Sequence, residues 1–308
     1  METRRIATLE VSVVGLGCNN FGWRIDEPAS HAVVNAALDA GINFFDTSDT
    51  YGKTKSEEFL GRALGARRAT VIIATKFGSE IDPAHKGARP EYVRQACEDS
   101  LRRLGTDYID LYQLHRPDPA TPISDTIGAM NELVSAGKVL QIGCSNFSAA
   151  QIVEADRESE RLGAAKFVSV QNNYNMLERE DEADAIPECE RLGLAYLPYF
   201  PLASGMLTGK IRKGKPIITG TRIAEIAWMK EKLTERNLDV IERLITFASV
   251  HNHTILELAM SWLLRLPVVA SVIAGATSPN QVRANAAAAN WRLSASDLAS
   301  VEGILSGS

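Results

Sequence analysis

Short apolar runs rich in β-branched residues alternate along the chain with longer segments in which apolar residues recur at helical spacing. The runs 71–74 and 269–273 are apolar at almost every position, which is typical of strands that helices bury on both faces. Eight runs are predicted as strands, at 13–18, 43–48, 70–76, 108–115, 139–146, 167–174, 194–200 and 269–275.

Six helices are predicted between these runs, and each is followed directly by a glycine. The predicted helices cover 28–40, 55–64, 90–104, 123–136, 148–162 and 183–192. The glycines are Gly41, Gly65, Gly105, Gly137, Gly163 and Gly193. Glycine readily adopts the left-handed conformation in which many helices end, so these positions mark helix ends.

Strands that alternate with helices predict a parallel sheet with right-handed crossovers. Eight strands favour a (β/α)8 barrel over an open sheet, and 15–20 lacks the third glycine of the Gly-x-Gly-x-x-Gly fingerprint. We expect one barrel domain over 1–308, with a β-hairpin of 4–8 and 10–14 that plugs the bottom. The segment 205–237 interrupts the alternation and is predicted as a long loop on the C-terminal face.

The charge and cysteine content narrow the function. Lys and Arg total 33 against 38 Asp and Glu, so the chain has no basic excess of the kind that nucleic-acid binding needs. The four cysteines, Cys18, Cys97, Cys144 and Cys189, form no Cys-x-x-Cys pair, which argues against a structural zinc site and a disulfide framework. We therefore expect no metal and a reducing compartment, the cytoplasm.

Neither end of the chain predicts a membrane segment. No apolar stretch follows the charged residues of 1–10, as a signal peptide would require. The apolar run 267–276 is shorter than the roughly 20 residues of a membrane span. We expect no membrane partner, and the sequence leaves the oligomeric state open.

Four chemically distinct side chains follow consecutive predicted strands. Asp46 and Tyr51 come from the second strand and the turn after it, Lys76 ends the third and His115 ends the fourth. Chemistry in a barrel gathers at these strand ends, although each residue alone also suits a structural role. Together, the four residues are suited to act as a general acid that protonates an oxygen. A nearby Lys76 cation lowers the pKa of the Tyr51 phenol, Asp46 holds the lysine, and His115 orients a carbonyl oxygen.

The stretch Phe45-Asp46-Thr47-Ser48-Asp49-Thr50-Tyr51-Gly52 resembles the second-strand signature of the aldo-keto reductases. The resemblance covers nearly the whole chain and extends to the bacterial and potassium-channel β-subunit-like branch. It implies NAD(P)H-dependent reduction of an aldehyde or ketone. In that reading Tyr51 is the proton donor, Lys76 its tuner, Asp46 the partner of the lysine and His115 the group that orients the substrate.

The cofactor side shows the same resemblance. Ile142–Phe147 looks like the family's Gly-x-Ser-Asn-Phe motif, Gln171 matches its amide-binding glutamine, and Tyr199 matches the aromatic residue that stacks on the nicotinamide. Read without the family, Ser145-Asn146 also fits a helix cap, and Tyr199 a core aromatic. The residues assigned to the cofactor are Gly17, Cys18, Asn19, Asp46, Ser145, Asn146, Gln171, Tyr199, Phe200, Pro201, Leu202, Ser204, Gly205, Leu207, Lys210, Gly275, Ala276, Thr277, Ser278, Gln281 and Asn285.

One departure concerns cofactor preference. Many family members have a lysine where this chain has Gly275 and an arginine where it has Gln281, and these cations bind the 2′-phosphate of NADP. A phosphate is still accommodated by backbone N–H groups at a helix N-terminus with Thr277, Ser278 and Gln281. We expect NADPH, with NADH or dual use as the alternative.

The substrate pocket is expected to include Trp23 with Tyr51 and His115. Two other functions remain open. The chain could be a cofactor-binding regulatory subunit of the channel β-subunit type. It could also be a barrel aldolase or isomerase in which Lys76 forms a Schiff base. The sequence does not identify the carbonyl substrate.

Overall fold

The computed structural model describes residues 1–307. Within that range eight parallel strands form one sheet in the order β10-β3-β4-β5-β6-β7-β8-β9. Two isolated bridges, Tyr196 to Val269 and Tyr199 to Ile273, join the last strand to the first and close the sheet. The predicted (β/α)8 barrel is confirmed. Its strands are β3 (Val14–Gly17), β4 (Phe44–Asp46), β5 (Ile72–Phe77), β6 (Ile109–Leu114), β7 (Val139–Ser145), β8 (Phe167–Gln171), β9 (Ala195–Tyr196) and β10 (Val272–Gly275).

Some strands are shorter than predicted, and the seventh differs most. Strand β9 has two residues where 194–200 was expected. Pro198 has no N–H to donate to a neighbouring strand, and Phe200 has a positive φ of 52°. The pairing therefore continues beyond β9 only as single bridges.

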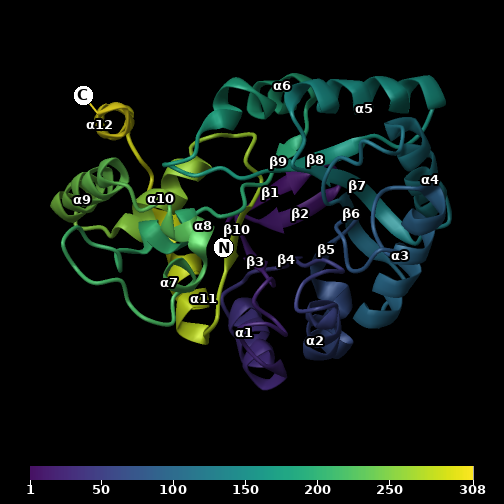
Figure 1. Cartoon of the computed structure of the whole chain (residues 1–308), viewed down its shortest axis with the longest axis horizontal. Helices are drawn as coiled ribbons and strands as arrows, with labels where there is room; N and C mark the ends of the chain where they lie inside the picture. Colours follow the sequence, from purple (N-terminus) through teal and green to yellow (C-terminus); the bar gives the residue numbers. More distant parts are fainter. Residues whose placement is uncertain (308) are drawn as a thin grey trace.

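The helices surround the strands (Figure 1). The six predicted helices are present with small shifts at their ends, as α1 (Glu27–Asp39), α2 (Lys55–Leu64), α3 (Pro90–Leu104), α4 (Ile123–Ser135), α5 (Ala149–Leu162) and α6 (Ala185–Leu192). All six glycines predicted to follow helices have φ between 50° and 78°. The left-handed helix end is confirmed for Gly105, Gly163 and Gly193, which cap their helices in that conformation, whereas Gly65 combines its positive φ with a ψ of −127°.

The N-terminal hairpin pairs β1 (Thr3–Ile6) with β2 (Leu9–Ser12). Its apolar side chains belong to a buried cluster that also contains Phe44, Ala74 and Leu111 of the barrel strands. Asn43, which precedes β4, accepts a hydrogen bond from the Ser12 backbone. The hairpin therefore plugs the end of the barrel at which the strands begin, as predicted, with slightly shorter strands than expected.

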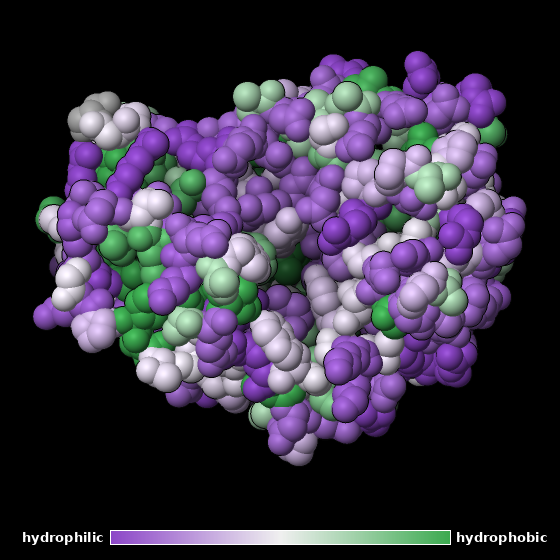
Figure 2. Space-filling view, viewed as in Figure 1, coloured by the Kyte–Doolittle hydropathy of each residue, from purple (hydrophilic) through white to green (hydrophobic). Residues whose placement is uncertain are grey.

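The segment after β9 contains short helices that the sequence pattern did not predict. These are η3 (Ala203–Thr208), α7 (Arg222–Glu225) and α8 (Ala227–Lys230), and they precede α9 (Glu235–Val250) and α10 (Ile255–Leu264). The remaining elements are η1 (Gly65–Thr70), η2 (Glu180–Ala183), α11 (Pro279–Ala287), η4 (Ala288–Asn290) and α12 (Ala295–Ser306). Figure 2 shows apolar residues gathered over the side of the molecule that carries α7 to α9, on a mostly hydrophilic surface.

Candidate active site

Lys76 and Asp46 form a buried ion pair at the carboxyl ends of two adjacent strands. The Nζ atom of Lys76 on β5 lies 2.7 Å from both carboxylate oxygens of Asp46 on β4. The ammonium also donates to the backbone oxygen of Thr47 at 2.9 Å. Lys76 is fully buried and Asp46 is nearly so. The pair is thus held in one geometry by strand pairing and by three hydrogen bonds.

Tyr51 completes this arrangement from the turn that follows β4. Its phenolic oxygen lies 3.5 Å from Lys76 Nζ, and its ring meets the His115 ring edge to face. Gly52 makes the turn possible, because a Cβ atom there would lie 2.1 Å from the Phe21 carbonyl oxygen. The structure therefore brings all four predicted catalytic residues to one place.

Among these four residues, the pKa of Tyr51 differs from what the sequence led us to expect. Burial disfavours a charge on Lys76, but Asp46 overcomes it and raises the pKa of the ammonium. Burial also raises the pKa of Tyr51 above its ordinary value, and Lys76 offsets only part of that shift. The expectation of an acidified phenol is therefore wrong for the structure as described. Tyr51 is held protonated, and Lys76 lies where it would stabilise the phenolate once the proton has left.

His115 follows β6 and is neutral at ordinary pH. Burial together with the charges of Lys76 and Arg116 lowers its pKa to about 3. Its Nδ1 atom lies 3.1 Å from the hydroxyl of Ser48. A neutral imidazole carries one N–H, so the tautomer determines whether it donates to a ligand.

A cavity of about 760 Å³ opens over this group, a size ordinary for a cofactor pocket. Most of the residues predicted to bind the cofactor line it. They are Gly17, Asn19, Asp46, Ser145, Asn146, Gln171, Tyr199, Phe200, Pro201, Leu202, Ser204, Gly205, Lys210, Gly275, Thr277, Gln281 and Asn285.

Hydrogen bonds connect the predicted nicotinamide site to the buried ion pair. The Gln171 amide donates to Asp46 Oδ1 at 2.8 Å, and the Ser145 hydroxyl donates to the Gln171 backbone oxygen at 2.6 Å. The Tyr199 hydroxyl donates to Asn146 Oδ1 at 2.7 Å. Ser148, not Ser145 or Asn146, caps helix α5, so the helix-cap interpretation of that pair is wrong.

Some predicted residues lie behind the cavity wall or away from it. Cys18, Leu207 and Ala276 are buried, and Ser278 caps helix α11 with its side chain. The Trp23 side chain is 55% exposed and is not among the lining residues, so its place in the substrate pocket stays a prediction. The neighbouring Arg24 lines the cavity instead.

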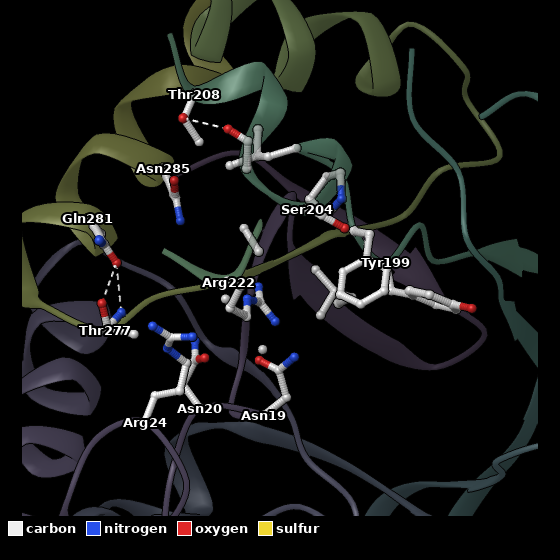
Figure 3. Close-up of a pocket in the computed structure, with 18 of the residues that line it drawn as sticks. Asn19, Asn20, Arg24, Tyr199, Ser204, Thr208, Arg222, Thr277, Gln281 and Asn285 are labelled. Atoms are coloured by element: carbon white, nitrogen blue, oxygen red, sulfur yellow. Dashed lines mark hydrogen bonds between the residues drawn. The ribbon is translucent and has the colours of Figure 1, made fainter. Parts of the chain in front are cut away.

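Sequence reasoning missed several lining residues, of which Asn20, Arg24 and Arg222 matter most. Arg24 donates to Glu225 and to the Gly220 carbonyl, and so connects the first βα loop to the segment after β9. Arg222 lies beside Arg24 (Figure 3), and its side chain has no hydrogen bond or ion pair within residues 1–307. Burial and the Arg24 charge lower the pKa of Arg222.

Unpartnered polar atoms and an unpaired cation in the cavity wall fit a cofactor that carries both hydrogen-bond donors and negative charge. Asn19 Oδ1, Asn20 Oδ1 and Ser204 Oγ are buried without a hydrogen-bond partner in the described part of the chain. All three residues line the cavity (Figure 3). Such atoms are costly unless a ligand or water satisfies them. Arg222 adds an unneutralised cation, which suits a phosphate.

The comparison with family models gives a match over residues 13–306 to the aldo/keto reductase family. The chain belongs to the aldo/keto reductase family. Aldo/keto reductases act on small carbonyl compounds with nicotinamide cofactors, so the protein is an NAD(P)-dependent oxidoreductase. The recognition made from the second-strand signature is confirmed.

Relatives of this aldo/keto reductase span nearly the whole chain. A probable aldo-keto reductase of Glycine max is 35% identical over 94% of this chain and 84% of its own length. A probable voltage-gated potassium channel subunit beta of Oryza sativa subsp. japonica is 35% identical over 90% of this chain and 87% of its own. An uncharacterized oxidoreductase of Bacillus subtilis is 34% identical over 89% of this chain and 86% of its own.

Residues 1–307 contain no helix with a long enough apolar stretch to span a membrane. In the same part of the chain, no group of three or more His, Cys, Asp or Glu side chains is placed to hold a metal ion.

Proposed function

We propose that this aldo/keto reductase reduces an aldehyde or ketone to an alcohol, with Tyr51 as proton donor and NADPH as hydride donor. The observation that carries the proposal is the position of the Tyr51 hydroxyl. This hydroxyl lies 3.5 Å from Lys76 Nζ. Tyr51 also lines the same cavity as Gln171 and Tyr199. A proton donor and a nicotinamide site at one cavity are what carbonyl reduction requires.

Each of the four side chains has its own role in the proposed reduction. When bound, the cofactor supplies a hydride from its nicotinamide ring. The substrate oxygen gains negative charge, and the Tyr51 hydroxyl protonates it. The Lys76 ammonium stabilises the phenolate that results, and Asp46 keeps Lys76 charged and oriented. Neutral His115 positions the carbonyl oxygen through an N–H donor.

The cofactor would be held by three groups of residues. Ser145, Asn146 and Gln171 would bind the carboxamide, and Tyr199 would stack on the ring. The first turn of α11, with Thr277, Ser278 and Gln281, would bind the adenosine phosphate. In the structure Gln281 accepts from the Thr277 backbone N–H at 2.7 Å, a bond that ties the residue before Ser278 to the first turn of α11. The segment 205–237 would cover the pyrophosphate as part of one barrel domain spanning 1–308.

The proposed preference for NADPH rests on cations at other positions than the two that bind the 2′-phosphate in many family members. Arg24, Lys210 and Arg222 line the cavity, although Gly275 and Gln281 provide no charge. Initial rates with NADPH and NADH in parallel test this preference. A tenfold or greater preference for NADH would contradict it.

The decisive experiment is a panel of aldehydes, ketones and sugars assayed by loss of nicotinamide absorbance. Tyr51→Phe should lower turnover by about 10²–10⁴-fold, the usual contribution of a general acid, and should leave NADPH affinity nearly unchanged. Binding measured by quenching of intrinsic fluorescence provides the control. Full turnover in Tyr51→Phe would overturn the proposed mechanism.

The alternative functions receive less support. A lysine that forms an imine must lose its proton, whereas Asp46 raises the pKa of Lys76. Borohydride in the presence of a carbonyl compound should therefore trap no adduct. The regulatory-subunit alternative draws on the names of two plant relatives, from Oryza sativa subsp. japonica and Arabidopsis thaliana. Cytoplasmic localisation is also part of the proposal, since all four cysteines are free and buried.

A further inference from the structure

A chain of hydrogen bonds joins the His115 ring to the buried carboxyl group of Asp49. The Ser48 hydroxyl lies 3.1 Å from His115 Nδ1 and 3.0 Å from Asp49 Oδ1. Asp49 is fully buried, and its second oxygen, Oδ2, has no partner within residues 1–307. The proposed mechanism assigns no role to this carboxyl group, although only two hydrogen bonds separate it from His115, the residue proposed to orient the substrate.

Ser48 has one hydroxyl proton, so it donates either to His115 or to Asp49. The Thr50 backbone N–H lies 3.3 Å from the Ser48 oxygen and also bonds the Asp49 carboxyl group, so it is shared between the two. The single Ser48 proton cannot be donated to His115 and to Asp49 at once. When one of these neighbours accepts it, the other can bond the Ser48 oxygen only as a donor. A third neighbour, Thr50 Oγ1 at 3.1 Å, is a neutral hydroxyl and the weaker competitor beside a carboxylate.

Each protonation state of Asp49 selects a different state of the histidine. A charged Asp49 is the stronger acceptor and takes the Ser48 proton. The Ser48 oxygen then accepts from Nδ1–H, and Nε2 of His115 is left without a proton. A protonated Asp49 donates to Ser48 instead, Ser48 donates to Nδ1, and Nε2 carries the N–H. Only the second state offers a hydrogen-bond donor to a carbonyl oxygen.

We propose that Asp49 is a positioning residue that selects, through Ser48, which ring nitrogen of His115 carries its proton. The inference rests on the proposed function insofar as His115 orients a carbonyl group. It adds that the neutral form of Asp49 is the form that supports carbonyl reduction.

Charged and titratable groups from several helices and strands surround Asp49 and His115, the two residues that this series of hydrogen bonds connects. Asp49 is faced by Glu57 of α2, by Tyr92 and Arg103 of α3, and by Tyr112 of β6. His115 is faced by Lys76, Arg116 and Tyr51. Burial and the Glu57 charge raise the pKa of Asp49 to about 7, against the opposing effects of its hydrogen bonds and Arg103. Because the pKa of His115 is about 3, the ring stays neutral while Asp49 titrates.

The tautomer of His115 can be observed directly by nitrogen-15 NMR of histidine-labelled protein between about pH 5 and pH 9. The chain has five histidines, and a His115→Gln variant assigns the signals of interest. We expect Nε2–H at the acidic end and Nδ1–H at the alkaline end. This measurement requires no cofactor and no turnover, so it stands even if the proposed reductase activity fails.

Two variants and one control complete the test. In Asp49→Asn and in Ser48→Ala the tautomer should no longer change with pH, and Asp49→Asn should keep kcat/KM at alkaline pH where the wild type loses it. Asp82→Asn is the matched control, because Asp82 bonds the exposed His85 at 2.8 Å and should leave His115 unchanged. A wild-type His115 with one tautomer throughout, or the same pH-dependent change in Asp49→Asn, would overturn the proposal.

Discussion

Lys76 Nζ lies 2.7 Å from each carboxylate oxygen of Asp46, and both side chains are shielded from solvent. The only other side chain that bonds this carboxylate within residues 1–307 is Gln171, at 2.8 Å. A pair of this kind contributes little net stability, but removing one partner leaves a buried charge without compensation. The ion pair therefore couples the integrity of the fold to the chemistry proposed at Tyr51.

Lys76→Met should lower both stability and turnover. The buried Asp46 carboxylate would lose its counterion, which costs about 3–5 kcal/mol in comparable pairs, and Tyr51 would lose the cation that stabilises its phenolate. Denaturant unfolding and initial rates measure the two effects.

The double variant Asp46→Asn/Lys76→Met separates these two effects. It should regain stability without regaining turnover, because the uncompensated charge is gone but the cation is still missing. Lys86→Met, which removes an exposed partner of Glu80, serves as the control and should change neither quantity appreciably. An unimpaired turnover in Lys76→Met would contradict the role given to the lysine.

The sequence predicted those parts of the site that lie at a fixed offset from a strand. Asp46 ends β4, Lys76 lies near the end of β5 and His115 follows β6, so the apolar runs located them. Arg222 was missed because it lies in the irregular segment after β9, where no periodicity places a side chain. Its only signal was its occurrence in a long loop on the C-terminal face.

The sign of the Tyr51 pKa shift was missed for a different reason. Spacing along the chain places a lysine near a phenol, but it does not reveal how much water the folded protein removes from that phenol. The cost of burial exceeds the attraction of Lys76 in the structure. Similarly, the Ser48 hydrogen bond to His115 depends on the orientation of two side chains from different strand ends, which no pattern encodes.

Arg222→Gln should weaken NADPH binding by about 10–100-fold, because a charge-assisted hydrogen bond contributes about 1.5–3 kcal/mol. The effect should appear in the KM for NADPH and be smaller for NADH if the missing cation faces the 2′-phosphate. Arg283→Gln on α11 is the control, since Arg283 is exposed and bonds only Asn280 among the described residues. An unchanged KM for both cofactors would show that Arg222 does not contact them.

Gly52→Ala should be more damaging than Gly65→Ala, although both glycines have positive φ angles of 59° and 50°. An added Cβ at position 52 would meet the Phe21 carbonyl oxygen at 2.1 Å, whereas one at position 65 would meet no described residue within 4 Å beyond its own helix and chain neighbours. Gly65→Ala should therefore cost only the backbone strain, about 1–3 kcal/mol. Gly52→Ala should cost more and also lower turnover, because the turn that carries Tyr51 must shift. Thermal unfolding and initial rates measure this, and equal effects of the two variants would contradict it.

Asp49→Asn should stabilise the protein at neutral and alkaline pH. The folded-state pKa of Asp49 is about 7, above the ordinary value of 3.8. For a carboxyl group with a raised pKa, the stabilising contribution is complete below about pH 4 and is lost as the pH rises through about 7. The advantage of the asparagine variant should therefore grow across this window and level off above it. At about 1.4 kcal/mol per pKa unit, it should reach a few kcal/mol.

Asp82→Asn provides a control. The hydrogen bond from His85 lowers the pKa of Asp82 below its ordinary value of 3.8, so its contribution is lost only as the pH falls below about 4, and this variant should run parallel to the wild type at higher pH. Urea unfolding of the wild type and both variants at about five pH values between 4 and 9 gives the three curves. If the wild-type and Asp49→Asn curves run parallel over that range, Asp49 does not titrate in the folded protein between those limits, which would contradict its role in selecting the His115 tautomer.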